Sequence, residues 1–117
     1  MEEDRVRAEA LKGHLDGLLL AVLEAGPAHG YAVVEALRSD SGGRFDLPTG
    51  TVYPALHRLE RAGLARSGWS VVAGRRRRTY ELTNAGHRAL ADERTRWEEF
   101  ASAMSTVLQP RPQPAAP

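Results

Sequence analysis

The residues of this chain best suited to charged chemistry are its arginines, which are concentrated in one segment. Between Arg44 and Tyr80 the sequence has eight basic residues and two acidic ones, and Arg75 to Arg78 are consecutive. Four adjacent guanidinium groups repel one another, and a phosphate backbone relieves that repulsion while releasing counterions. Because residues 1–43 and 81–117 are both net acidic, the total charge of +1 conceals one cationic module. This pattern predicts contact with nucleic acid, with a merely solvated turn as the alternative.

The segment before the arginine run predicts a helix from about Thr49 with two different faces. Its apolar face is formed by Val52, Ala55, Leu56 and Leu59, which recur at helical spacing. The opposite face carries Thr51, Tyr53, Pro54, His57, Arg58 and Arg61. Thr51 and Tyr53 are near the helix N-terminus, where they are suited to hydrogen bonds with phosphate oxygens. His57 and Arg58, one turn later, are suited to base edges or phosphates, and a solvated helix face is the alternative.

Other kinds of chemistry find little support in the sequence. The four histidines do not show a metal-ligand spacing, and there is no cysteine, so neither a metal nor a cofactor is expected. An enzyme that uses His57 and Tyr53 would lack any supporting motif. The longest apolar run has six residues, far short of the ~20 that span a bilayer. Together with an N-terminus that lacks a signal-peptide core, this predicts a soluble cytoplasmic protein with no membrane contact, and 117 residues predict one domain at most.

The elements that would position these residues follow one another in a simple order. An apolar stripe predicts a helix over 15–23 that Gly26-Pro27 ends, and a second helix is expected over 30–39. The third helix has the Thr49 hydroxyl as its expected N-cap and Gly63 as its stop. Strands are expected over 64–72 and 78–82, joined by a tip over 73–77. Three helices followed by a hairpin predict a winged helix, mainly α with a small β-hairpin, whose third helix enters the major groove while the hairpin touches the flanking backbone.

A last helix is expected over 85–108, capped by Thr83-Asn84, and it is about 36 Å long at 1.5 Å per residue. It carries an apolar stripe at roughly heptad spacing: Leu90, Trp97, Phe100, Ala101, Met104 and Leu108. The preceding domain is too small to cover this stripe, so we expect a second copy of the chain to cover it. Trp97 is suited either to this interface or to contact with a ligand. The proline-rich segment 109–117 is expected to be disordered.

Three runs of the sequence closely resemble the PadR family of transcriptional regulators. They are HGYAVVEAL (29–37), PTGTVYPALHRLERAGL (48–64) and RRRRTYELTNAG (75–86). In that family a Gly-Tyr opens the second helix, Gly-Thr-x-Tyr-Pro-Ala-Leu opens the third, and Tyr-x-Leu-Thr-x-x-Gly leads from the wing into the C-terminal helix. The resemblance covers residues 14 to 108, and the short C-terminal region is similar to the subfamily with a single long dimerisation helix.

The resemblance implies a homodimeric winged-helix repressor that binds a palindromic operator in double-stranded DNA. In some members a small aromatic molecule relieves repression, and related dimers stack flat ligands near the position of Trp97. The implied organisation is an N-terminal arm or helical extension (1–13), a DNA-binding domain (14–83), a dimerisation helix (84–108) and the tail. Tyr31 is expected mainly to pack on the third helix, with its hydroxyl in reach of a phosphate. The expected DNA-binding residues are Tyr31, Thr49, Gly50, Thr51, Tyr53, Pro54, His57, Arg58, Arg75, Arg76 and Arg77.

One rival function remains open at this point. A winged helix can serve as a protein-binding module, whose basic wing would then meet an acidic partner. The two functions differ in a property that can be measured, because a DNA reader discriminates an operator from random sequence.

Overall fold

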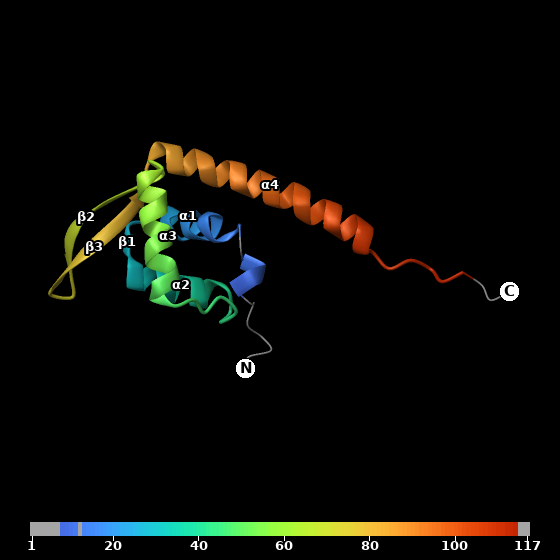
Figure 1. Cartoon of the computed structure of the whole chain (residues 1–117), viewed down its shortest axis with the longest axis horizontal. Helices are drawn as coiled ribbons and strands as arrows, with labels where there is room; N and C mark the ends of the chain where they lie inside the picture. Colours follow the sequence, from blue (N-terminus) through green and yellow to red (C-terminus); the bar gives the residue numbers. More distant parts are fainter. Residues whose placement is uncertain (1–7, 12, 115–117) are drawn as a thin grey trace.

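The computed structural model describes residues 8–11 and 13–114, and much of the expected N-terminal arm lies outside this part. Its element order confirms three helices, a hairpin and a long last helix (Figure 1). The elements are η2 (Ala8–Leu11), α1 (Leu15–Glu24), β1 (Ala28–His29), α2 (Gly30–Asp40), α3 (Thr49–Arg61), β2 (Ala65–Val72), β3 (Arg75–Leu82) and α4 (Asn84–Leu108). The predicted class, mainly α with a small β-hairpin, is therefore confirmed.

The core lies between the first three helices and the base of the hairpin. Its most completely buried side chains come from the apolar stripes of all three helices: Leu19, Val33, Val52, Leu56 and Leu59. Tyr80 and Leu82 close it from β3. Because the predicted apolar face of α3 is fully used in this core, the opposite face of α3 must point outward.

The hairpin forms part of a three-stranded antiparallel sheet in the order β1-β3-β2. Ala28 and His29 of β1 pair with Tyr80 and Thr79, and this strand of two residues was not predicted from the sequence. The turn of the hairpin is only Ala73 and Gly74, whose φ angles are 52° and 78°. The predicted tip over 73–77 was therefore wrong. A two-residue turn with positive φ matches the twist of the strands, so β3 continues through all four arginines.

The observed helix ends can be compared with the capping residues predicted from the sequence. The N-cap of α3 is Pro48, with no side-chain hydrogen bond, so the prediction of Thr49 was wrong. The Pro48 carbonyl accepts hydrogen bonds from the N–H groups of Thr51 and Val52, which makes Thr49 the first helical residue. The other predicted signals are confirmed. Thr83 accepts a hydrogen bond from the Gly86 N–H at 3.0 Å, and Gly63 has the positive φ of a helix stop.

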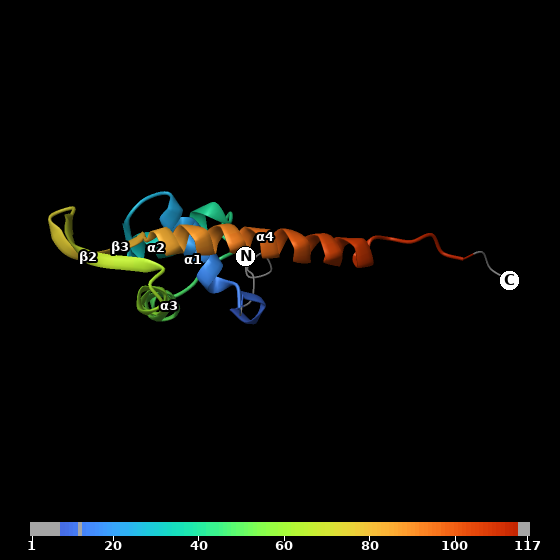
Figure 2. The same cartoon turned by 90° about the horizontal axis from the view of Figure 1, so that it is seen from above.

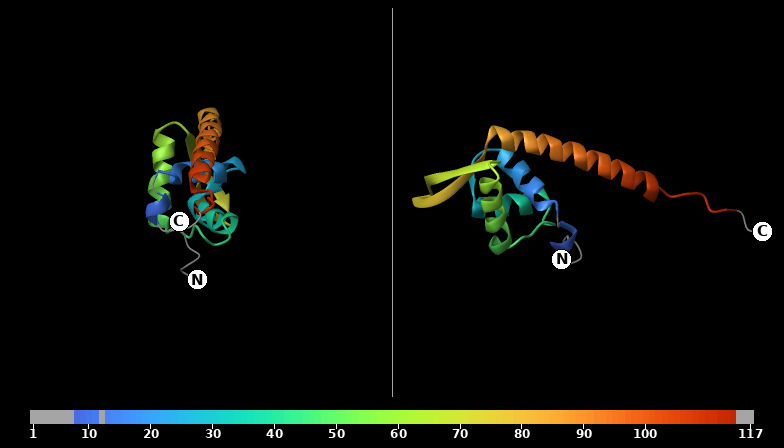
Figure 3. Two further views of the ribbon diagram at one scale, coloured as in Figure 1. Left: turned by 90° about the vertical axis from the view of Figure 1, so that its right-hand side faces the viewer. Right: turned by 45° about the horizontal axis from the view of Figure 1, so that its top comes forward.

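Helix α4 packs on α1 over its first turns and then continues beyond the helical body (Figures 1 and 2). Of its residues, all of which the structure describes, only Gly86 and Leu90 are buried. The hairpin projects from the opposite side of the body (Figure 3, right). Among the described residues, the fold thus leaves two features uncovered, the hairpin and the distal part of α4.

Candidate nucleic-acid interface

The outward face of α3 carries the predicted DNA-binding residues in exposed positions. Seven of them are exposed to solvent: Thr49, Gly50, Thr51, Tyr53, Pro54, His57 and Arg58. Tyr31 on α2 is also exposed, over 51% of its surface, so the expectation that its main role is packing on α3 was wrong. Its ring points away from the core because Val33, Val34 and Leu37 occupy the buried face of α2.

Tyr53 on α3 packs closely against the start of α2. A Cβ built on Gly30 would lie 1.8 Å from Cε1 of Tyr53, so the ring rests directly on the Gly30 backbone. Only glycine permits this approach at the first residue of α2. The sequence contains both residues within separate motifs, but nothing in their spacing predicted that they meet.

A groove separates α3 from the hairpin. Its cavity of about 240 Å³ is lined from α3 by Tyr53 and His57, and from the hairpin by Trp69, Tyr80 and the arginines Arg76 to Arg78. The rings of His57 and Tyr80 lie 6.3 Å apart at its floor. Burial is the main cause that raises the pKa of the Tyr80 hydroxyl, and the charge of Glu60 raises it further. The exposed face of α3 is therefore continuous with one face of the hairpin.

The four arginines divide between the two faces of the hairpin, because β-strand side chains alternate. Arg76 and Arg78 share the α3-facing side with Trp69, and their Cζ atoms lie 4.9 and 5.7 Å from its ring centroid. Arg75 and Arg77 alternate with them and pair in register with Val72 and Ser70, and Arg77 also contributes to the lining of the groove. Arg75 to Arg77, which were predicted to form the tip, therefore lie along the strand with Arg78.

Several arginines of the cationic segment are neutralised within the chain. Arg58 pairs with Asp16 at 2.9 Å, and Arg66 pairs with Glu81 at 2.7 Å. Arg78 lies 3.8 Å from Glu60 and donates to the Ser67 hydroxyl, which itself donates to Glu60. Within the described part of the chain, the remaining five have no carboxylate partner: Arg44, Arg61, Arg75, Arg76 and Arg77. Uncompensated positive charge is thus richest on the hairpin.

His29 forms the N-cap of α2 beside this site and was not predicted from the sequence. Its Nδ1 accepts a hydrogen bond from the Ala32 N–H at 3.2 Å, which requires that nitrogen to be unprotonated. Desolvation lowers the pKa of His29, and the charge of nearby Arg77 lowers it further. Both effects favour the neutral ring that the cap needs.

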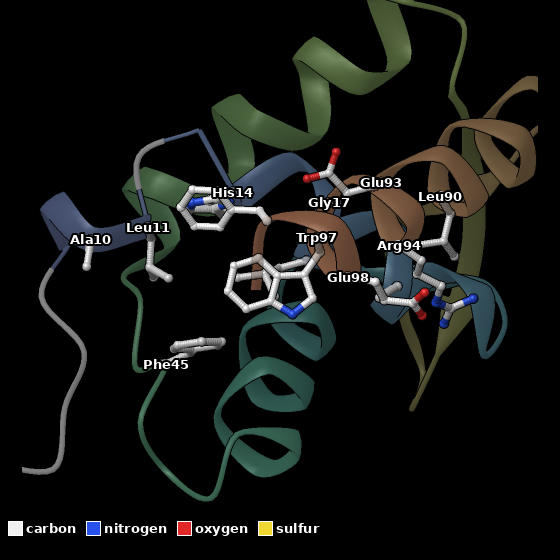
Figure 4. Close-up of a pocket in the computed structure, with 13 residues that line it drawn as sticks. Ala10, Leu11, His14, Gly17, Phe45, Leu90, Glu93, Arg94, Trp97 and Glu98 are labelled. Carbon is white, nitrogen blue, oxygen red and sulfur yellow. The ribbon is translucent and has the colours of Figure 1, made fainter. Parts of the chain in front are cut away.

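A second cavity lies between α1 and α4 and has a volume of about 750 Å³. Trp97 lies across it, with His14 edge-on at 5.8 Å between ring centroids and Phe45 on the far wall (Figure 4). Arg94 at its margin is held by a bidentate pair with Glu24, at 2.8 and 3.0 Å, which lowers the pKa of Glu24. Leu90, which was predicted to lie in a dimer interface, is only 2% exposed and belongs to the chain's own core.

The part of the chain that the structure describes contains no group of three or more His, Cys, Asp or Glu residues placed to hold a metal ion. None of the described helices is long and apolar enough to cross a membrane.

Comparison with known proteins places this geometry in a family. The model of the transcriptional regulator PadR-like family matches residues 19–92, more than half of the chain. The crystal structure of a PadR family transcriptional regulator from Eggerthella lenta is 32% identical, with a TM-score of 0.75 over 88% of each chain. A transcriptional regulator from Clostridium thermocellum has the same fold, with a TM-score of 0.80 at 22% identity over 89% of this chain and 99% of that one.

A curated relative gives higher identity over a shorter stretch. A transcriptional regulator of Mycobacterium tuberculosis is 54% identical over 52 residues, which are 44% of this chain and 49% of that protein. The matched stretch thus spans about half the length of that relative. All of these proteins are described as regulators rather than as enzymes. With its winged helix and its family match, the chain belongs to the PadR-like family of DNA-binding transcriptional regulators.

Proposed function

We propose that this protein is a repressor that binds a palindromic operator as a homodimer in the cytoplasm. The observation that carries the proposal is the continuous surface formed by the exposed face of α3 and the arginine-bearing hairpin. In this arrangement residues 14–83 bind DNA and residues 84–108 dimerise. Each α3 enters the major groove of one half-site, and the two half-sites lie about 34–36 Å apart or a multiple of that distance.

Within α3 we assign positioning and reading to different residues. Thr51 and Tyr53 hold phosphates, and His57 and Arg58 contact base edges. Tyr53→Phe should therefore weaken binding to all sequences alike, whereas His57→Ala should relax preference at particular bases, with about 1–3 kcal/mol of discrimination per good contact. Electrophoretic mobility shifts on a set of single-base operator variants distinguish these outcomes. A uniform loss for His57→Ala and Arg58→Ala would refute direct reading by these two residues.

The hairpin supplies sequence-independent affinity. Replacing Arg75, Arg76 and Arg77 together with Ala should weaken binding to operator and random duplex alike. The slope of log affinity against log salt should shrink by about 0.9 for each phosphate that a subunit no longer neutralises. Fluorescence anisotropy of labelled duplexes, in salt from roughly 50 to roughly 200 mM, measures this slope. An unchanged slope, or no preference for operator over random DNA, would favour the protein-binding module.

The distal part of α4 is proposed as the dimer interface. Trp97 and Phe100 are 53% and 54% exposed, and Met104 and Leu108 continue the same stripe with Ala101 between them. Such a run of exposed apolar side chains on a helix outside the body is suited to a second copy of the same helix. Leu90 is left out of this interface because it is buried in the chain's own core.

A matched pair of variants tests the dimer. Phe100→Glu with Met104→Glu should give monomers, because an unpaired charge in an apolar interface is costly. Ser102→Glu with Thr106→Glu places two glutamates at the same spacing on the opposite, exposed face and should remain dimeric. Sedimentation velocity reports the state of each. A normal dimer for the first pair would show that the apolar stripe is not the interface.

The cavity beside Trp97 is the proposed site of a small aromatic effector. Its apolar walls and the exposed indole are suited to stacking of a planar molecule. Relief of repression requires that the molecule bind more tightly to a dimer whose α3 helices do not match the half-site spacing. A screen of planar aromatic compounds by tryptophan fluorescence tests this, with Trp97→Ala and Trp69→Phe as paired variants. Quenching that survives Trp97→Ala but is absent in Trp69→Phe would place the ligand at the hairpin instead.

A further inference from the structure

Trp69 is the most unusual side chain of the hairpin. It occupies the middle of β2, directly opposite Arg78 in the register of the sheet, and 60% of its surface is exposed. Val71, two residues along on the same face, is 71% exposed. Large apolar side chains of this kind are usually buried, and a cluster of them on an exposed strand indicates a contact surface.

The side chains around the indole are cationic. Arg76 and Arg78 both lie within cation–π distance of its ring. Arg78 is tethered to Glu60 and Ser67, so its charge is balanced and its position is held. Arg76 has no carboxylate partner in the described part of the chain, so it retains an uncompensated charge beside the exposed ring.

The partner must therefore offer apolar surface next to negative charge. The backbone of a DNA duplex does so, because each deoxyribose presents C–H groups between two phosphates. Trp69 also lines the groove whose other wall is Tyr53 and His57 of α3, so a duplex contacted by α3 passes along this side of the hairpin. Val72 and Arg75 lie on the other side of the same hairpin.

We propose that Trp69 is a DNA-contacting residue of this regulator, whose indole packs on deoxyribose while Arg76, stacked against it, pairs with the adjacent phosphate. This inference rests on the proposed function, since it requires that the α3 face bind duplex DNA. The proposal also assigns different contributions to the hairpin arginines. Arg76 contacts the duplex beside α3, and Arg75 contributes less because it points from the opposite face.

The direct test uses the two tryptophans of the chain as reporters. Trp97→Phe leaves Trp69 as the sole tryptophan, and Trp69→Phe leaves only Trp97. Each variant is titrated at low salt with a random-sequence duplex carrying a fluorescein label, so that anisotropy reports binding in the same cuvette. On binding, acrylamide quenching of Trp69 should fall clearly, whereas quenching of Trp97 should not change.

The outcomes separate the inference from the proposed function. If anisotropy rises but Trp69 remains as accessible to acrylamide as before, the duplex is bound elsewhere and the inference is overturned. If anisotropy does not rise even for the unmodified protein, the proposed function itself fails. An acidic protein partner in place of DNA would give that second result.

Affinity measurements add a readout that a purely structural role of Trp69 would not produce. Trp69→Ala should weaken duplex binding roughly threefold to tenfold per subunit, the scale of one aromatic contact, with an unchanged salt slope. Arg76→Ala should lower that slope by about 0.9 per subunit. Val72→Ala, on the opposite face, is the control and should do neither. Equal losses of affinity for Trp69→Ala and Val72→Ala would show that the substitutions only disturb the hairpin and would refute the contact.

Discussion

Gly30→Ala tests how α3 is held against α2. The added Cβ would lie 1.8 Å from Cε1, 2.4 Å from Cδ1 and 2.9 Å from Cζ of Tyr53, and these three atoms are its nearest neighbours. The Tyr53 ring must therefore leave its place on α2. Overpacking of this kind costs about 1–3 kcal/mol. It exceeds the gain of about 0.4–1 kcal/mol that alanine normally brings by restricting the unfolded chain.

The effect of Gly30→Ala on stability should change sign when the Tyr53 ring is removed. In a Tyr53→Ala background the ring atoms that obstruct the added Cβ are absent, so Gly30→Ala should become neutral or stabilising. The expected coupling between the two substitutions is about 1–3 kcal/mol, well above the error of additivity for independent sites. Urea denaturation of the four proteins, all at one protein concentration, measures it.

The same cycle has a consequence for DNA. Gly30→Ala displaces a ring that we place on a phosphate, so it should weaken binding to random duplex about as much as Tyr53→Ala does. The double variant should bind no worse than Tyr53→Ala alone. If Gly30→Ala destabilises the protein equally in both backgrounds, the Gly30–Tyr53 contact does not decide the position of the ring, and the reasoning fails.

Three further predictions concern single contacts. Gly86→Ala should lower the free energy of unfolding by about 3 kcal/mol or more in urea denaturation, which is more than Gly30→Ala does. Its Cβ would lie 2.0 Å from the Leu64 carbonyl oxygen, a backbone atom that cannot rotate away as a side chain can. Equal losses of stability for the two variants would contradict this. Asp16→Asn should leave stability within about 1 kcal/mol, since its pair with Arg58 is half exposed. It should tighten binding to the operator at low salt, because it frees Arg58 for contact with DNA. No change in affinity, or the same change in an Arg58→Ala background, would refute a role for Arg58 at the DNA. The pKa of His29 is lower in the folded state, so its contribution to stability is complete above its unfolded pKa of about 6.5 and is lost as pH falls below that value. The difference in the free energy of unfolding between the unmodified protein and His29→Ala should therefore shrink from about pH 8 to about pH 5. A constant difference would contradict the capping role of His29.

The periodicity of apolar residues predicted the first three helices well, because the residues at helical spacing are the ones that the structure buries. The apolar stripe of α3 and the stop at Gly63 appear in the structure as predicted. The Thr83 cap was predicted for the same reason, since its hydroxyl acts on a residue only three positions away. Local signals of this kind are readable from sequence because the partner is a near neighbour along the chain.

The features that the sequence did not predict depend on contacts between distant segments. β1 consists of two residues and exists only because β3 offers it an open edge. Arg75 to Arg77 were assigned to the tip, whereas the short Ala73-Gly74 turn determined the register and extended the strand through them. The Gly30–Tyr53 contact joins residues of two different motifs, and no spacing rule connects them.

The net charge of a segment is therefore a poor guide to where a regulator of this kind holds DNA. The cationic segment includes α3, but Arg58 on α3 is paired with Asp16, and Glu60 near its end anchors Arg78. Much of the uncompensated charge lies instead on β3, on both faces of a hairpin that touches no base edge in our proposal. It follows that affinity and its salt dependence should depend mainly on the hairpin, while α3 contributes discrimination with little net charge. Substitutions on the hairpin should then change affinity and its salt dependence, whereas substitutions on α3 should change discrimination between sequences. A repressor needs this separation in order to search DNA and still recognise one site.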